Sequence, residues 1–137
     1  MWVMFAVSKL ALMTLLVDSY ETGIAFFTDV LGFELVEDSP STTNDGAPKR
    51  WVVVKPPGGE CGLLLAMADG PAQAVLVGAQ MGGRVGFFYH VDDFAEVYER
   101  MARAGVEFME PPRNEVYGQV VVFKDVFGNK WDLLGPA

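Results

Sequence analysis

The chain has 137 residues, half of them hydrophobic, and carries a net charge of −8 at pH 7. This length suits one domain that can bury a core without disulfides. The single cysteine, Cys61, excludes an internal disulfide and a thiol-based metal cluster, and it suits a reducing cytoplasm. The acidic balance argues against nucleic acid and anionic membrane surfaces as partners, and it is compatible with a neutral or cationic small molecule.

The N-terminal stretch MWVMFAVSKLALMTLLV is apolar, but it does not predict a membrane segment. A spanning helix needs about 20 apolar residues, and Lys9 interrupts this run near its middle. A secretory signal would need a basic start and a small-residue cleavage site, and neither is present. We therefore expect a short apolar lead-in, then a buried strand from Lys9 to Val17, and no membrane partner.

An amphipathic helix, SYETGIAFFTDVL, follows the first strand. It places Ile24, Phe27 and Leu31 on one stripe, and Gly32 ends it. Three strands come next, FELVED, RWVVVKP and CGLLLAM, with turn chemistry between them in SPSTTNDGAP and PPGGE. These elements form a first module over about residues 9–68, and residues 69–83 are interpreted as a linker.

The same order of elements returns after the linker, over about residues 84–135. The strand RVGFFYHV precedes the helix DDFAEVYERMARA, which ends at Gly105, and the strands VEFME, GQVVVFKD and KWDLLG follow. The halves align residue by residue, matching Val17 with Val91, Lys55 with Lys124 and Leu63 with Asp132. Five elements repeated in order form a specific pattern. Residues 1–137 are therefore predicted to be one domain of two βαβββ modules.

Several stretches carry a resemblance to a known family. FFTDVLGFELVED and FKDVFGNKWDLL resemble the vicinal oxygen chelate (VOC) superfamily of glyoxalases, bleomycin resistance proteins and dioxygenases, and YHVDDFAEVYERMARAGVEFMEPP fits the same family. The similarity extends from about Leu10 to Leu134. It implies an α+β fold in which two βαβββ modules form a curved mixed sheet around a cleft. It also implies a homodimer, and it leaves open whether the modules pair within one chain or across the dimer.

Metal-using members of this family hold a divalent ion on four inward-facing residues, typically His or Glu, from the first and fourth strands of each module. The resemblance carries these positions onto Leu12, Gly86, Leu63 and Asp132. Leucine and glycine side chains offer no donor atom, and His90 is the single histidine. Shifting the first-strand alignment to Met13 or Thr14 does not restore the set. We therefore predict that the metal site is lost and that no cofactor is bound.

Asp132 then remains as a carboxylate among apolar neighbours on the last strand. A buried carboxylate needs a partner, because leaving its charge unpaired away from water is costly. In one interpretation it accepts hydrogen bonds inside the sheet and has a purely structural role. In the other it faces the cleft, where it binds a donor group of a ligand or transfers a proton.

Three further residues are candidates for the cleft. His90 and Phe88 share the inward parity of Gly86, because side chains alternate along a strand. Histidine is suited to proton transfer near neutral pH, although a position at the strand end also fits a helix-flanking or solvent-facing role. Gly86 would open volume in the cleft. Tyr117 lies in PPRNEVYGQ, which would either line the cleft mouth or be an ordinary solvated loop.

These observations favour a metal-free binding protein that sequesters a small aromatic or cationic molecule, as drug-resistance relatives do. The candidate ligand-binding residues are Leu12, Thr14, Leu63, Gly86, Phe88, His90, Tyr117 and Asp132. The alternative is a lyase or isomerase of glyoxalase type that uses His90 and Asp132. It would need another way to stabilise a developing oxyanion, and no cluster of Arg or Lys is evident for that purpose. A dimer with only a structural or protein-binding role is the third possibility.

Overall fold

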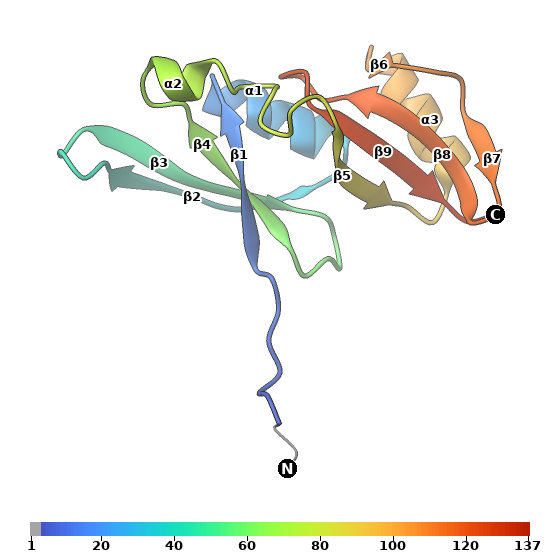
Figure 1. The fold of residues 1–137 in the computed structure, drawn as a ribbon, viewed down its shortest axis with the longest axis horizontal. Helices are drawn as coiled ribbons and strands as arrows, with labels where there is room; N and C mark the ends of the chain where they lie inside the picture. Colours follow the sequence, from blue (N-terminus) through green and yellow to red (C-terminus); the bar gives the residue numbers. More distant parts are fainter. Residues whose placement is uncertain (1–3) are drawn as a thin grey trace.

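The structure is a computed structural model in which residues 4–137 are described, and it contains two modules with the same order of strands (Figure 1). The first module comprises β1 (Leu12–Val17), α1 (Tyr20–Ala25), the π-helical segment η1 (Phe26–Val30), β2 (Glu34–Thr42), β3 (Pro48–Lys55) and β4 (Gly62–Met67). A short helix, α2 (Pro71–Ala74), lies in the linker. The second module comprises β5 (Val85–His90), α3 (Phe94–Arg103), β6 (Glu107–Phe108), β7 (Arg113–Glu115), β8 (Gly118–Lys124) and β9 (Lys130–Gly135).

The strands form two mixed sheets with matching topology. Their orders are β1-β4-β3-β2 and β5-β9-β8-β6, with β7 pairing β8 from the side. In each module the first strand runs parallel to the last, and the remaining pairs are antiparallel. The predicted α+β fold with repeated βαβββ modules is confirmed.

Local signals in the sequence begin and end the helices where expected. The Ser19 side chain accepts a hydrogen bond from the Thr22 amide, and the Asp93 side chain accepts one from the Glu96 amide, so both long helical segments have N-caps. Gly32 follows the first of them with a φ of +78°, a conformation that glycine adopts without steric cost. Phe27 and Leu31, two members of the predicted stripe, are fully buried.

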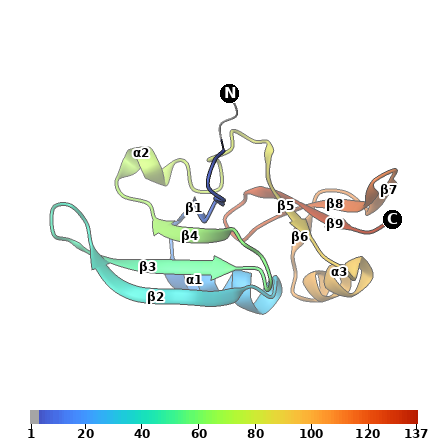
Figure 2. The same cartoon turned by 90° about the horizontal axis from the view of Figure 1, so that it is seen from below.

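One hydrophobic core joins the two modules. The helices α1 and α3 lie on the same side of the molecule (Figure 2), and aromatic side chains fill the space between them and the sheets. The Phe87 and Trp131 rings stack at 4.5 Å, and Phe27 and Phe33 from the first module also contact Trp131. The face of each sheet that the helices do not cover is called the open face below.

Three predicted elements were wrong in extent. Half of the expected turn SPSTTNDGAP is strand, because β2 continues to Thr42 and β3 starts at Pro48. Pro40 is tolerated there because β2 is an edge strand, where the missing N–H costs no sheet hydrogen bond. The strand expected in VEFME shrinks to Glu107–Phe108, and the expected loop PPRNEVYGQ contains β7.

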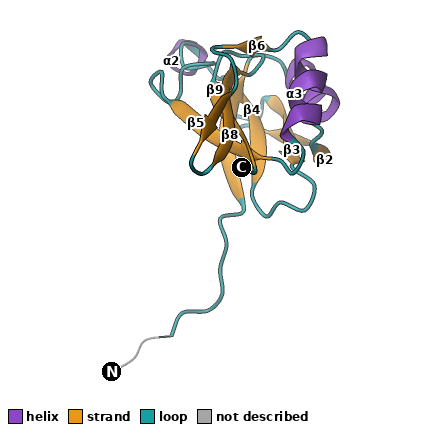
Figure 3. Cartoon of the chain, turned by 90° about the vertical axis from the view of Figure 1, so that its right-hand side faces the viewer, coloured by secondary structure: helices purple, strands orange, loops and turns teal. Residues whose placement is uncertain are grey.

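The N-terminal strand also differs from the prediction. It was expected to be buried from Lys9, but β1 begins at Leu12, and only Leu15 and Val17 in it are fully buried. Residues 4–11 run away from the rest of the described chain in an extended path (Figures 1 and 3). None of the helices among residues 4–137 is long and apolar enough to cross a membrane.

Candidate functional site

Asp132 lies on the open face of the second module. In the sheet register it is paired with Phe88 on β5 and Val122 on β8, and directly paired residues point to the same face. Its chain neighbours Trp131 and Leu133 point the other way and are buried in the core. The ring of Phe88 is 65% exposed, so the carboxylate stands beside an aromatic side chain that is largely open to solvent.

One oxygen of the Asp132 carboxylate lacks a hydrogen-bond partner among residues 4–137. Its Oδ1 atom is buried and accepts no hydrogen bond from the described residues. Burial raises the pKa of the carboxyl above its ordinary value of 3.8, the charge of Arg113 lowers it, and that of Glu110 raises it. Arg113 itself is engaged elsewhere, because its Nε lies 2.9 Å from Glu110 and its Nη1 contacts Glu115. Asp132 is therefore a half-buried acid with unused acceptor capacity.

The fourth-strand match between the modules is wrong by one residue. The alignment paired Leu63 with Asp132 and Val54 with Phe123. In the sheets, however, Val54 pairs with Leu63, whereas Phe123 pairs with Trp131. Leu63 is therefore equivalent to Trp131. The connection before β4 is one residue longer than the one before β9 (56–61 against 125–129), which an ungapped alignment misses. Leu63 thus packs in the core and Leu64, paired with Thr14, takes the position equivalent to Asp132.

The first-strand positions differ in their surroundings. Side chains alternate along β1, and Leu15 and Val17 point into the core. Leu12 and Thr14 have the opposite parity and therefore lie on the open face of the first module. Gly86 sits at a register shift in β5 and does not open volume as expected. A Cβ atom added there would stand 2.3 Å from the Met81 side chain, so the linker already fills that space.

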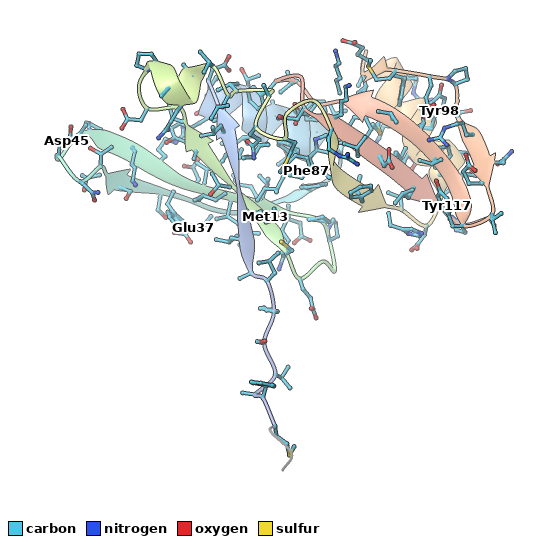
Figure 4. The ribbon with its side chains drawn as sticks, viewed as in Figure 1. Met13, Glu37, Asp45, Phe87, Tyr98 and Tyr117 are labelled. Carbon is cyan, nitrogen blue, oxygen red and sulfur yellow. The ribbon has the colours of Figure 1, made fainter. Side chains whose placement is uncertain are left out.

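The other two candidates are not joined to Asp132. His90 is exposed at the end of β5, on the same open face by strand parity, and its side chain forms no hydrogen bond with another side chain or backbone group of residues 4–137. Tyr117 lies in the turn between β7 and β8, exposed at the far end of the second module (Figure 4). Nothing in this arrangement assembles an acid–base pair from His90 and Asp132.

The residues present do not fit the divalent metal that the fold family implies. With the register corrected, the four positions are Leu12, Leu64, Gly86 and Asp132. Only the last has a side chain that can coordinate a cation. Among residues 4–137 no group of three or more His, Cys, Asp or Glu side chains is gathered in a way that could hold an ion.

Sequence reasoning missed a hollow in the first module that is lined by both polar and apolar residues. It has a volume of about 620 Å³ and opens where β3 and β4 separate, because their pairing stops at Val52 and Leu65. Its lining includes Tyr20, Arg50, Trp51, Leu64, Asp69 and Gln73. The length of a strand pairing depends on contacts across the sheet, so no local sequence signal marks the place where it ends.

The charge of Arg50, one of the residues that line this hollow, is already neutralised. Arg50 forms ion pairs with Asp38 and Glu21, and its guanidinium lies 5.0 Å from the centre of the Tyr20 ring. These contacts raise the pKa of Arg50, with the Asp38 hydrogen bond as the largest cause. An anionic ligand would therefore have to compete with two carboxylates for the same guanidinium.

Comparison with known proteins places the fold in a family. A model of the Glyoxalase/Bleomycin resistance protein/Dioxygenase superfamily matches residues 9–133. An uncharacterized protein of Shewanella frigidimarina (strain NCIMB 400) is 46% identical over 121 residues, which span 88% of this chain and 87% of that protein.

Two solved structures are also similar at low identity. UcmS2 is 29% identical with a TM-score of 0.76, over 94% of this chain and 98% of its own. TnmS3, an antibiotic binding protein from Streptomyces sp. CB03234, is 27% identical with a TM-score of 0.76, over 98% of this chain and 100% of its own. The sequence match, the repeated modules and the shared architecture agree, and the chain belongs to the glyoxalase/bleomycin resistance protein/dioxygenase superfamily.

Proposed function

We propose that the protein binds a small cationic aromatic molecule on the open face of its second module, without transforming it. The observation that carries this proposal is the unsatisfied Asp132 carboxylate beside the exposed ring of Phe88. A buried acceptor without a partner costs about 1–3 kcal/mol, which a cationic donor would recover. The adjacent aromatic ring would contact the flat body of the ligand and add a cation–π attraction.

The comparisons support a binding role at a coarser level. TnmS3 is named as an antibiotic binding protein, and it shares the fold over nearly all of its length. The acidic charge of −8 favours a cation over an anion. We also propose a homodimer in a reducing cytoplasm, supported by large apolar side chains that one copy leaves exposed and by the unpaired Cys61.

The test compares two ligands that differ in charge but share a ring system. 9-Aminoacridine is a cation at neutral pH and acridine is neutral there. Isothermal titration should show tighter binding of 9-aminoacridine to the wild-type protein. Asp132→Asn keeps the shape of the side chain. It should lower the affinity for 9-aminoacridine by roughly 10- to 150-fold, which corresponds to the loss of a charge-assisted hydrogen bond of about 1.5–3 kcal/mol. Acridine affinity should change little.

Two further variants locate the site. Phe88→Ala should lower the affinity for both ligands, because the contact with the Phe88 ring does not depend on the charge of the ligand. Asp92→Asn is the matched control, since it removes an exposed carboxylate that lies beyond the end of β5. Equal losses in Asp132→Asn and Asp92→Asn would mean that only net charge matters, and the proposed site would be wrong.

A further inference from the structure

One side chain of the linker is bonded to the first sheet. The Gln80 carboxamide makes two hydrogen bonds to β1: its Oε1 accepts one from the Leu16 amide, and its Nε2 donates one to the Thr14 carbonyl, both at 2.9 Å. Gln80 is half-buried where the linker passes β1 on its way from α2 to β5 (Figure 1). Within residues 4–137, these two are the only hydrogen bonds from residues 69–83 to a strand.

The two bonds lie on the outer edge of β1. β1 is the terminal strand of its sheet, so one of its edges has no neighbouring strand. The carbonyl groups of Ala11 and Val17 accept hydrogen bonds from the β4 side, so the odd-numbered residues of β1 direct their backbone groups to β4. Thr14 and Leu16 alternate with them and present their C=O and N–H groups on the outer edge. The Gln80 carboxamide therefore bonds to the pair of groups that one residue of an added parallel strand would use.

Two further residues of the linker contact the second module. Gly78 lies against the turn between β8 and β9, where a Cβ atom would collide with the Phe127 carbonyl oxygen, and its φ of +77° also favours glycine. Met81 fills the space beside Gly86 on β5. Residues 78–81, called the linker clamp below, thus contact β1 of one module and β5 and the β8–β9 turn of the other.

The two edges of the first sheet differ in how they are protected. Edge strands usually avoid pairing with other chains through charged side chains, proline, bulges or a covering segment. β2, at one edge, has the first three of these in a register shift and in Glu34, Glu37, Asp38 and Pro40. β1, at the other edge, has the sequence LMTLLV, with no charge and no proline. It is therefore the edge that needs a cover, and Gln80 supplies one.

We propose that the Gln80 carboxamide is a built-in cap that closes the outer edge of β1 to strands of other molecules, and that the linker clamp holds this cap in place. Without the cap, an uncharged six-residue edge is free to pair with a strand of another copy, and the protein associates beyond its native state. The inference goes beyond the ligand site and does not depend on the ligand at Asp132.

Amide exchange of the full chain, measured by NMR, tests the cap at single residues. Gln80→Met keeps a side chain of similar length but lacks the carboxamide, so exchange of the Leu16 amide should become faster by roughly tenfold or more. The Leu15 amide, which faces β4, should not change. Gln73→Met is the matched control, because Gln73 lies in the same linker and accepts its hydrogen bond from the Asp69 amide instead. Equal exchange of Leu16 in Gln80→Met and the wild type would overturn the proposal.

Sedimentation velocity tests what the cap prevents. Gln80→Met should form species that are larger than the wild type and that grow with protein concentration. Gln80→Lys also removes the carboxamide but places a charge at the edge, which opposes strand pairing. It should lose the protection of Leu16 and still sediment as the wild type does. A Gln80→Met variant of wild-type size with an unprotected Leu16 would overturn the capping role. Equal association of the Met and Lys variants would also overturn it, because strand pairing would then not be the cause.

These outcomes are separate from those of the ligand and homodimer proposals. The wild-type species is the reference in sedimentation whether it is a monomer or a dimer, so the test of the cap does not require the homodimer. Titration of 9-aminoacridine into Asp132→Asn reports on the ligand site alone. Failure of either proposal therefore leaves the cap to be decided by Leu16 exchange and by the size of the Gln80 variants.

Discussion

Two aspartates near the end of the chain show how differently the same side chain can be held. Asp125 is buried and accepts hydrogen bonds from the backbone amides of Phe127 and Asn129, from the Asn129 side chain and from the Trp131 indole, at 2.9–3.0 Å. Asp132 is partly buried, and its Oδ1 accepts no hydrogen bond from the part of the chain that the structure describes. The satisfied acid anchors the turn between β8 and β9, whereas the unsatisfied one keeps a free acceptor atom, which is the basis of the binding proposal above.

Asp125→Ala should therefore be strongly destabilising. It would leave several buried donors unpaired and release the Trp131 indole from the turn, so the free energy of unfolding should fall by about 2–4 kcal/mol. Urea denaturation followed by tryptophan fluorescence measures the change. Asp92→Ala, at an exposed position, should stay within about 0.5 kcal/mol of the wild type. A small loss in Asp125→Ala would show that the turn does not depend on this network.

Asp132→Asn should have the opposite effect on stability. Burial raises the folded-state pKa of Asp132, so the folded protein binds more protons than the unfolded chain between pH 3.8 and that raised pKa. The contribution of Asp132 to the free energy of unfolding of the wild type therefore falls as the pH rises through that window, and it stays reduced at higher pH. The asparagine variant avoids this cost and should have a higher Tm than the wild type near neutral pH.

The pH dependence distinguishes this effect from a change in packing. The difference in Tm between Asp132→Asn and the wild type should shrink towards zero at about pH 3, where the carboxyl is protonated in both states. Asp92→Asn should show no such dependence on pH. A variant that melts lower than the wild type at neutral pH would mean that the carboxylate is satisfied after all and has a structural role.

At the level of elements, the sequence predicted the order and type of the helices and strands well. The same five elements occur in both halves of the chain, so each half supports the assignment of the other. The face on which a residue lies was predicted less well. Alternation along a strand is strict, so a single extra loop residue before β4 moves every β4 side chain to the opposite face. That is why Asp132 and Phe88 were placed together correctly while Leu63 was not.

Features that depend on contacts between residues far apart in the chain could not be predicted from the sequence. The Ser- and Pro-rich end of β2 reads as a turn, but it is a strand because β3 lies alongside it from Pro48. The space at Gly86 was expected to be open, and Met81 from the linker occupies it. The unpaired Oδ1 of Asp132 could not be foreseen either, because the donors available to a side chain are set by tertiary packing.

The β4 register can be tested by placing an acid at two adjacent positions. Leu63→Asp would bury a carboxylate in the core and should cost about 3–5 kcal/mol of unfolding free energy. Leu64→Asp places it on the half-buried open face and should cost about 1–2 kcal/mol. Urea denaturation of both variants compares them directly. The ungapped alignment predicts the reverse order, so that result would refute the register described above.

At the scale of the whole molecule, a VOC metal centre requires donors from both modules. Here the first module contributes Leu12 and Leu64 and the second contributes Gly86 and Asp132, so one chain offers a single donor side chain. Pairing two copies adds at most a second Asp132, and two carboxylates without imidazole bind transition metals weakly in competition with water. Neither one chain nor a pair of copies would therefore supply the set of donors that such a centre needs.

Protein incubated with Zn²⁺, Ni²⁺, Mn²⁺ or Fe²⁺ and then desalted should accordingly retain less than roughly 0.1 equivalent of metal per chain by elemental analysis. The melting temperature should also be unaffected by these ions, since a ligand bound only by the folded state would raise it. Asp132→Asn serves as the control, because residual binding at the expected position should disappear in that variant while adventitious surface binding should not. Retention of one equivalent that depends on Asp132 would show that donors outside the four aligned positions complete a metal site.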